Sequence, residues 1–186
     1  MSKKKLVYTK YYLIEPPLES QSSSEERPNT DMKLEIGSIN VGSAYASTKI
    51  VHRNRSNEIV YFNYHQWAVL PEVSIAQMAT DYFRSTHDFA EVSRYISDNS
   101  PDYRLEIEVS RIEMLEVSGE INAHIVVRYK YIDAVSGKLI TQERYDKSSK
   151  MSQKDVNLLA KSVSTLIWDS LGQFFKKMAE YHNSDS

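Results

Sequence analysis

The chain has 186 residues, of which 41% are hydrophobic and 26% charged, a composition typical of one globular domain and not of a disordered segment. The formal net charge of −2 gives no electrostatic reason to expect nucleic acid as a partner, because phosphate binding needs a concentrated basic surface. The absence of cysteine excludes disulfides, thiolate metal sites and a cysteine nucleophile.

The N-terminal half predicts four strands and one helix. Residues 18–31 combine serine, charge and proline without periodicity, so we expect a mobile surface loop there, between two strands of the same domain. The helix is predicted to begin at Pro71, because proline suits the first helical turn and apolar residues follow at helical spacing. In chain order we expect strands at 5–14, 34–41, 49–52 and 58–64, with a polar turn at 53–57, and a helix at 71–86.

The C-terminal half predicts a short strand at 89–96, then three longer strands and a long helix. Apolar residues alternate with polar ones from Leu105 to Val109, and the alternation then shifts by one residue, which predicts a β-bulge near Ser110 and Arg111. Ser152 and Asp155 have the spacing of a helix capping box. The longer strands are expected at 105–114, 121–131 and 139–145 and the helix at 153–181, with Leu159, Val163, Leu166 and Phe174 facing the sheet.

These elements predict an α/β (α+β) fold, with a mixed, largely antiparallel sheet of five to seven strands covered by two amphipathic helices. We expect one domain over residues 8–181, preceded by a tether over residues 1–10 that runs into the first strand. No apolar stretch approaches the length of a membrane-spanning helix.

The sequence contains no pattern typical of catalysis or of metal or cofactor binding. None of the five histidines stands at metal-ligand spacing, and we interpret them, His124 included, as scattered surface residues. Nucleophile, phosphate-binding and nucleotide-binding motifs are absent. We therefore expect no catalytic residue, no cofactor and no metal, and predict that the protein is not an enzyme.

Aromatic residues beside arginines indicate a candidate partner surface. Aromatic and arginine side chains are enriched at the centres of protein interfaces. The alternative for Trp67 and Tyr61 is that both belong to the core, since they lie in a strand. The candidate residues are Tyr45, Arg53, Arg55, Tyr61, Tyr64 and Trp67.

Six segments, in this order, carry a resemblance to one family. They are YYLIEP, KLEIGSINVGSAYASTKIVHR, NEIVYFNYHQWA, RLEIEVSRIEM, GKLITQERYDKSSKM and LLAKSVSTLIWDSLGQFF. Together they make the chain, over about residues 8–178, resemble the ABC-type transport auxiliary lipoproteins, a PqiC/YmbA-like family.

The resemblance implies a protein of the periplasm, anchored in the outer membrane through a lipidated N-terminal cysteine. It also implies work with MCE-domain proteins and with the permease and ATPase of an ABC transporter, in moving lipid between membranes. Lipid and a second copy of the chain, in a homo-oligomer, are further candidate partners, and the sequence leaves open whether the domain itself binds lipid. Two alternatives stay open: a structural envelope lipoprotein that binds a partner without handling lipid, and an enzyme with an unrecognised site.

The sequence departs from the family at its front, where Met1 and Ser2 stand and the lipidated cysteine is absent. We expect the full-length gene to encode a signal peptide ending in a lipobox whose cysteine falls at or within a few residues of Met1. Reading the upstream codons checks this prediction. A cytoplasmic start at Met1 would contradict it.

Overall fold

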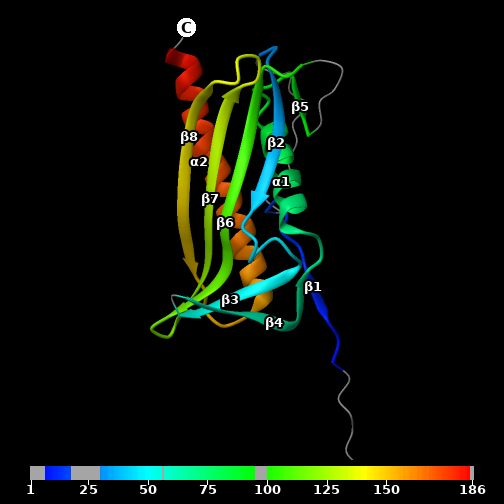
Figure 1. Cartoon of the computed structure of the whole chain (residues 1–186), viewed down its shortest axis with the longest axis vertical. Coiled ribbons are helices and arrows are strands. Elements are labelled where there is room, and N and C mark those ends of the chain that lie inside the picture. The colour runs from blue at the N-terminus through cyan, green and yellow to red at the C-terminus, as the bar shows by residue number, and fades with distance from the viewer. Residues whose placement is uncertain (1–6, 18–29, 56, 95–99, 185–186) are drawn as a thin grey trace, which may run out of the picture.

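The computed structural model of the chain describes residues 7–17, 30–55, 57–94 and 100–184. In chain order its elements are β1 Lys10–Tyr12, β2 Lys33–Val41, β3 Lys49–Arg55, β4 Glu58–Trp67, α1 Pro71–Ser85, β5 Glu91–Ser93, β6 Tyr103–Val117, β7 Glu120–Asp133, β8 Leu139–Lys150 and α2 Val156–Ser184. The fold is therefore the expected mixture of one mixed sheet and two helices (Figure 1). None of the described helices is long and apolar enough to cross a membrane.

Strand β6 is the centre of the eight-stranded sheet. On one side it pairs antiparallel with β7 along its whole length, and β7 pairs antiparallel with β8. On its other side, the first half of β6 pairs with β2 and the second half with β3, both in parallel. Strand β4 then pairs with β3, and β1 with β4, while β5 pairs with β2. The described sheet thus has one strand more than the largest number expected. Four of its seven strand pairs are parallel and three are antiparallel, so it is mixed as expected, but by number of pairs it is not largely antiparallel.

The predicted bulge in β6 is confirmed. The pairing of β6 with β7 shifts register between Val109 and Arg111. Before the bulge the odd-numbered residues of β6 face the core, and after it Ile112 and Met114 do so. Glu113 therefore points to the opposite face of the sheet, on the same side as its cross-strand partner His124.

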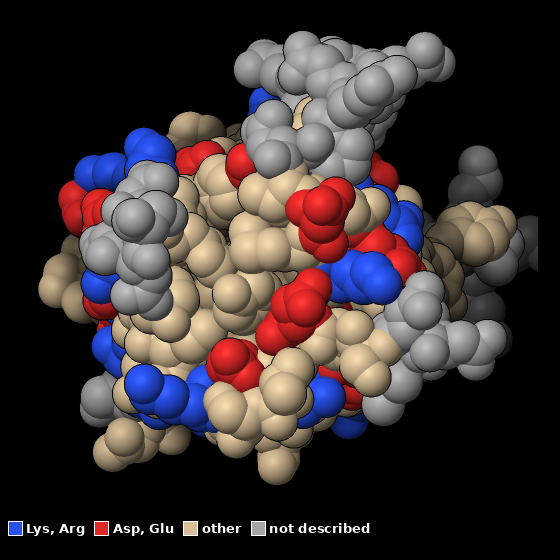
Figure 2. Space-filling view, turned by 90° about the horizontal axis from the view of Figure 1, so that it is seen from above, with Lys and Arg blue, Asp and Glu red and all other residues tan. Residues whose placement is uncertain are grey.

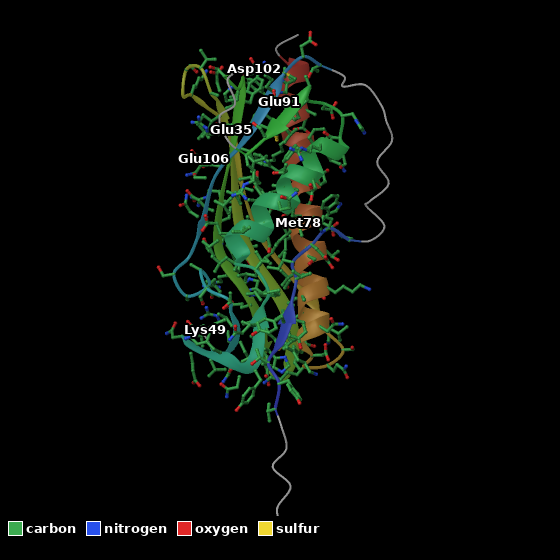
Figure 3. The ribbon with its side chains drawn as sticks, turned by 90° about the vertical axis from the view of Figure 1, so that its right-hand side faces the viewer. Glu35, Lys49, Met78, Glu91, Asp102 and Glu106 are labelled. Carbon is green, nitrogen blue, oxygen red and sulfur yellow. The ribbon has the colours of Figure 1, made fainter. Side chains whose placement is uncertain are left out.

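Both helices cover one face of the sheet and leave the other face without a helix (Figures 1 and 3). Helix α2 packs on β7 and β8, and α1 packs on β2. Tyr129 of β7 stacks on Phe174 and hydrogen-bonds Ser170 of α2 at 2.6 Å. The two helices meet through aromatic edges, such as Tyr82 against Trp168 at 4.9 Å. This layer is the core, and it accounts for the apolar stripes of both helices.

Several predicted boundaries were wrong. Strand β1 covers only Lys10–Tyr12 of the strand expected at 5–14, and residues 1–6 lie outside the described part of the chain, as do residues 18–29 of the loop expected at 18–31. The turn expected at 53–57 is much shorter, since β3 continues to Arg55. Helix α2 begins at Val156 because Asp155 is its N-cap, with its carboxylate accepting the backbone N–H of Leu158 at 2.9 Å.

The sheet-facing stripe of α2 also differs from the expectation at one position. Leu159, Val163 and Phe174 are fully buried as predicted, but Leu166 is only partly buried, and Ile167 takes its place. Because successive helical residues are rotated by a fixed angle, a stripe through 159, 163, 167 and 174 leaves residue 166 on its flank.

We therefore predict that Leu159→Ala lowers the free energy of unfolding by roughly 2–5 kcal/mol, as expected for a leucine that leaves a cavity in a packed core. The matched variant Leu166→Ala should cost about 1 kcal/mol, because its side chain already touches solvent. Chemical denaturation of both variants measures the difference, and equal losses would contradict this placement of the helix.

Candidate functional site

The structure separates the six residues predicted to form a partner surface. Tyr45 and Trp67 are buried in the core, with relative exposures of 5% and 2%, so neither lies on the surface; for Trp67 the alternative interpretation was right. Trp67 is the last residue of β4, and its backbone N–H donates to the carbonyl of Thr48 at 2.8 Å. Arg53 is largely buried, whereas Tyr61 and Tyr64 are exposed. The side chain of Arg55 lies outside the described part of the chain.

Tyr45 and Arg53 belong to a buried polar cluster around Glu113, which the sequence analysis missed. The Glu113 side chain has no exposed surface. The Tyr45 hydroxyl donates to its carboxylate at 2.6 Å, and Arg53 Nε lies 3.0 Å from both carboxylate oxygens. Arg53 Nη2 also donates to the Tyr45 hydroxyl at 2.7 Å. Three elements, β6, β3 and the connection at residues 42–48, are thereby joined at one carboxylate.

His124 of β7 extends this cluster to β8. Its Nδ1 lies 3.1 Å from Glu113 and its Nε2 lies 2.9 Å from Asp146. Carboxylates only accept hydrogen bonds when ionised, so both ring nitrogens must carry protons. His124 is therefore an imidazolium cation between two anions, and it is buried, not the surface residue expected from the sequence. Asp146 also accepts a bond from Arg144 at 2.9 Å.

The electrostatics agree with this assignment. Burial by itself would raise the pKa of Glu113, but hydrogen bonds from His124, Arg53 and Tyr45 outweigh it and lower that pKa to about 2. The hydrogen bond to Glu113 raises the pKa of His124 against the opposing effect of burial, and the bond to Asp146 adds to it. Burial, with Glu113 alongside, raises the pKa of Tyr45 to about 12.

The Glu113 cluster is built to hold the fold together and not to act on a substrate. Its carboxylate has donors on both oxygens and no exposed surface, so a ligand cannot reach it. Among the described residues, no group of histidine, aspartate and glutamate side chains could hold a metal ion. The cluster ties β3 to β6 and holds the 42–48 connection on the helix-free face of the sheet.

An exposed aromatic surface lies next to this anchored segment. Strand β4 bulges there, because residues 62–65 all lie opposite the single residue Ile50 of β3. Within the bulge Tyr64 has a left-handed backbone, with φ of 61°, and 56% of its surface is exposed. Tyr61 donates to the carbonyl of Ala44 at 3.3 Å, and Lys49 lies 5.1 Å from its ring. We call Lys49, Tyr61 and Tyr64 the β4 bulge surface; Lys49 is labelled at the lower end of Figure 3.

The inner side of the bulge is aromatic as well. Phe62 stacks on His52, and His65 stacks on Tyr12 while hydrogen-bonding its hydroxyl at 2.7 Å. His52 is buried and bonds Glu116 at 3.1 Å, so it too is not the surface histidine expected from the sequence. These contacts fix the bulge from inside, so the strained backbone of Tyr64 is a stable feature of the fold.

A half-open groove of about 840 Å³ runs along the first turns of α2. One wall is the segment from Tyr11 to Pro17, and the other is the outer side of α2 from Asn157 to Asp169. Tyr11, Leu13 and the two prolines make the first wall largely apolar, whereas the helix side is mostly polar.

Comparisons with known proteins agree with this architecture. The sequence model of the family described as "ABC-type transport auxiliary lipoprotein component" matches residues 11–173. A crystal structure of a protein from Xanthomonas campestris is similar, with a TM-score of 0.75 at 16% identity over 88% of this chain and 92% of that one. The crystal structure of an uncharacterized protein gives 0.72 at 13% identity, covering 92% of this chain and 99% of the other. At these identities the likeness concerns the fold. No curated protein sequence matches the chain.

The Glu113 cluster predicts a defined pH dependence of stability. The pKa of His124 is raised in the folded state, so its contribution is complete below 6.5 and is lost as the pH rises through the folded value. The pKa of Glu113 is lowered, so its contribution is complete above 4.5 and is lost as the pH falls toward about 2. The free energy of unfolding should therefore be highest between these limits.

The variant Glu113→Gln should lose roughly 3–5 kcal/mol at pH 6, because it removes the buried carboxylate that pairs with Arg53 and with Nδ1 of His124. In His124→Gln the loss of stability above neutral pH should disappear. Urea titrations across the pH range measure both effects, and a wild-type profile that is flat from neutral to alkaline pH would contradict the imidazolium assignment.

Proposed function

We propose, since the chain belongs to the family of ABC-type transport auxiliary lipoprotein components, that it serves a lipid transport system of the bacterial envelope by binding and assembly. The family is one of transport components and not of enzymes. The absence of a nucleophile, acid and base set among the described residues supports a role without turnover.

The observation that carries the proposal is the β4 bulge surface. An exposed tyrosine held in a left-handed backbone costs free energy, and such strain is kept where it presents a side chain for function. Tyr61 and Tyr64 are large, amphipathic and conformationally restricted, which suits interface anchors. Lys49 beside Tyr61 adds a cation within reach of an acidic partner.

The partner proposed for this surface is an MCE-domain protein working with the permease and ATPase of an ABC transporter. In this arrangement the domain lies in the periplasm, anchored in the outer membrane by an N-terminal lipid. The compact core, in which the helices fill the covered face of the sheet, favours assembly over carriage of lipid inside the domain.

We predict that Tyr64→Ala and Lys49→Glu each lower the yield of a crosslinked complex with the MCE-domain protein by about tenfold or more, as expected on loss of an interface anchor. The matched control is Val135→Ala, an exposed residue in the β7–β8 turn at the opposite end of the molecule. Full crosslinking by both surface variants, with folding verified by circular dichroism, would show that the partner binds elsewhere.

A further inference from the structure

Most exposed large apolar side chains of the described chain belong to elements in the half of the molecule that holds β1, β3 and β4, the lower half of Figure 1. Thirteen large hydrophobic residues are exposed, and eleven lie on β1 and the residues flanking it, on β4, on the start of α1 or at the β6–β7 turn. Only Val135 and Leu139 lie at the other end, by the β7–β8 turn. The end with the β7–β8 turn carries both acidic and basic side chains on its surface (Figure 2).

Five of these residues form one contiguous patch, distinct from the β4 bulge surface. Strand β1 runs parallel to β4 with Tyr12 opposite Trp67, and the backbone N–H of Ala68 bonds Tyr12 at 2.7 Å. Leu13 is therefore next to the segment that leads into α1. We call this set the N-terminal apolar patch: Tyr11, Leu13, Val69, Leu70 and Val73, with exposures of 39–63%.

The patch includes a run of exposed apolar residues in the connection from β4 to α1. Ala68, Val69 and Leu70 are consecutive and exposed, and Val73 follows on the first turn of α1. Scattered surface leucines and valines are ordinary, but a contiguous group of them with a tyrosine marks a contact surface. The half-open groove continues the patch along α2, since Tyr11 and Leu13 line both.

The charge of the adjoining N-terminal segment indicates what the patch contacts. Residues 1–17 contain four lysines and one glutamate, whereas the whole chain has a net charge of −2. In the sequence, the lysines at positions 3–5 come shortly before Val7 and Tyr8, which are 56% and 72% exposed, and β1 follows them beside β4 (Figure 1). Lysines beside tyrosine and aliphatic residues are the composition of segments that bind the interface of anionic membranes.

We infer that the N-terminal apolar patch lies against the surface of an anionic phospholipid bilayer. This rests on the proposed function in one respect, that the protein works at a membrane as a lipoprotein. An N-terminal anchor would hold the patch within one short tether of the lipid, so each apolar contact would act at high effective concentration. The bilayer contact would leave the β4 bulge surface to the protein partner.

The test is sedimentation of the 186-residue chain with vesicles made of equal parts of phosphatidylcholine and phosphatidylglycerol, at millimolar lipid. The double variant Leu70→Ser/Val73→Ser should bind about tenfold more weakly, since two half-exposed aliphatic groups lose their apolar contact. The matched control Val135→Ser/Leu139→Ser removes similar apolar surface at the opposite end and should bind like the wild type. Vesicles of phosphatidylcholine alone should bind more weakly, and added salt should weaken binding to the anionic vesicles.

A fluorescent label gives an independent readout, because the chain has no cysteine and a single introduced one is labelled uniquely. An environment-sensitive dye on Leu70→Cys should brighten and shift to the blue on adding vesicles, whereas the same dye on Val135→Cys should not change.

Absence of wild-type binding, or an equal loss in both double variants, would overturn the inference. So would loss of the MCE-domain complex, without any vesicle binding, in Leu70→Ser/Val73→Ser, because the patch would then be a protein interface. The vesicles contain no protein, so a failure here leaves the crosslinking test of the proposed function unaffected.

Discussion

A carboxylate without exposed surface constrains the whole helix-free side of the sheet. Glu113 lies in β6, the central strand, to which the other strands are joined directly or through strands between them. A buried charge is tolerated only where opposite charges and hydrogen bonds surround it. Arg53, Tyr45 and His124 supply them from three different segments, so those segments have to come together around Glu113. Removing any one of them leaves the buried Glu113 carboxylate without one of its hydrogen-bond donors.

This constraint links the core to the candidate binding surface. Tyr45 holds the 42–48 connection down on the sheet, and the carbonyl of Ala44 in that connection accepts the hydroxyl of exposed Tyr61. The same connection bonds the end of β4 through Thr48 and Trp67. The β4 bulge surface is thus supported by groups that are themselves buried. A partner that contacts it would meet a preorganised surface and would lose less conformational entropy on binding.

Hydrophobic periodicity predicted most elements, including the bulge in β6, because alternation and helical spacing record which face is buried. It could not predict the Glu113 cluster. Polar residues on the helix-free face, such as His124, have the same pattern whether they meet water or are covered by a connection from elsewhere in the chain. One signal was available. Glu113 and His124 are equidistant from the two-residue turn at Ser118 and Gly119, both of which have a left-handed backbone, so a tight hairpin places them side by side. The fold of the 42–48 connection over Glu113 depends on long-range contacts that no local pattern encodes.

The most direct test of this account is amide hydrogen exchange in Glu113→Gln compared with wild type. If Glu113 holds the 42–48 connection and β3 in place, protection should fall chiefly over residues 42–55, while the middle of α2 and the β7 residues beneath it keep most of theirs, as expected when one cooperative segment opens before the rest. Unchanged protection over residues 42–55, or an equal loss throughout the chain, would contradict the claim that this buried carboxylate positions the binding surface.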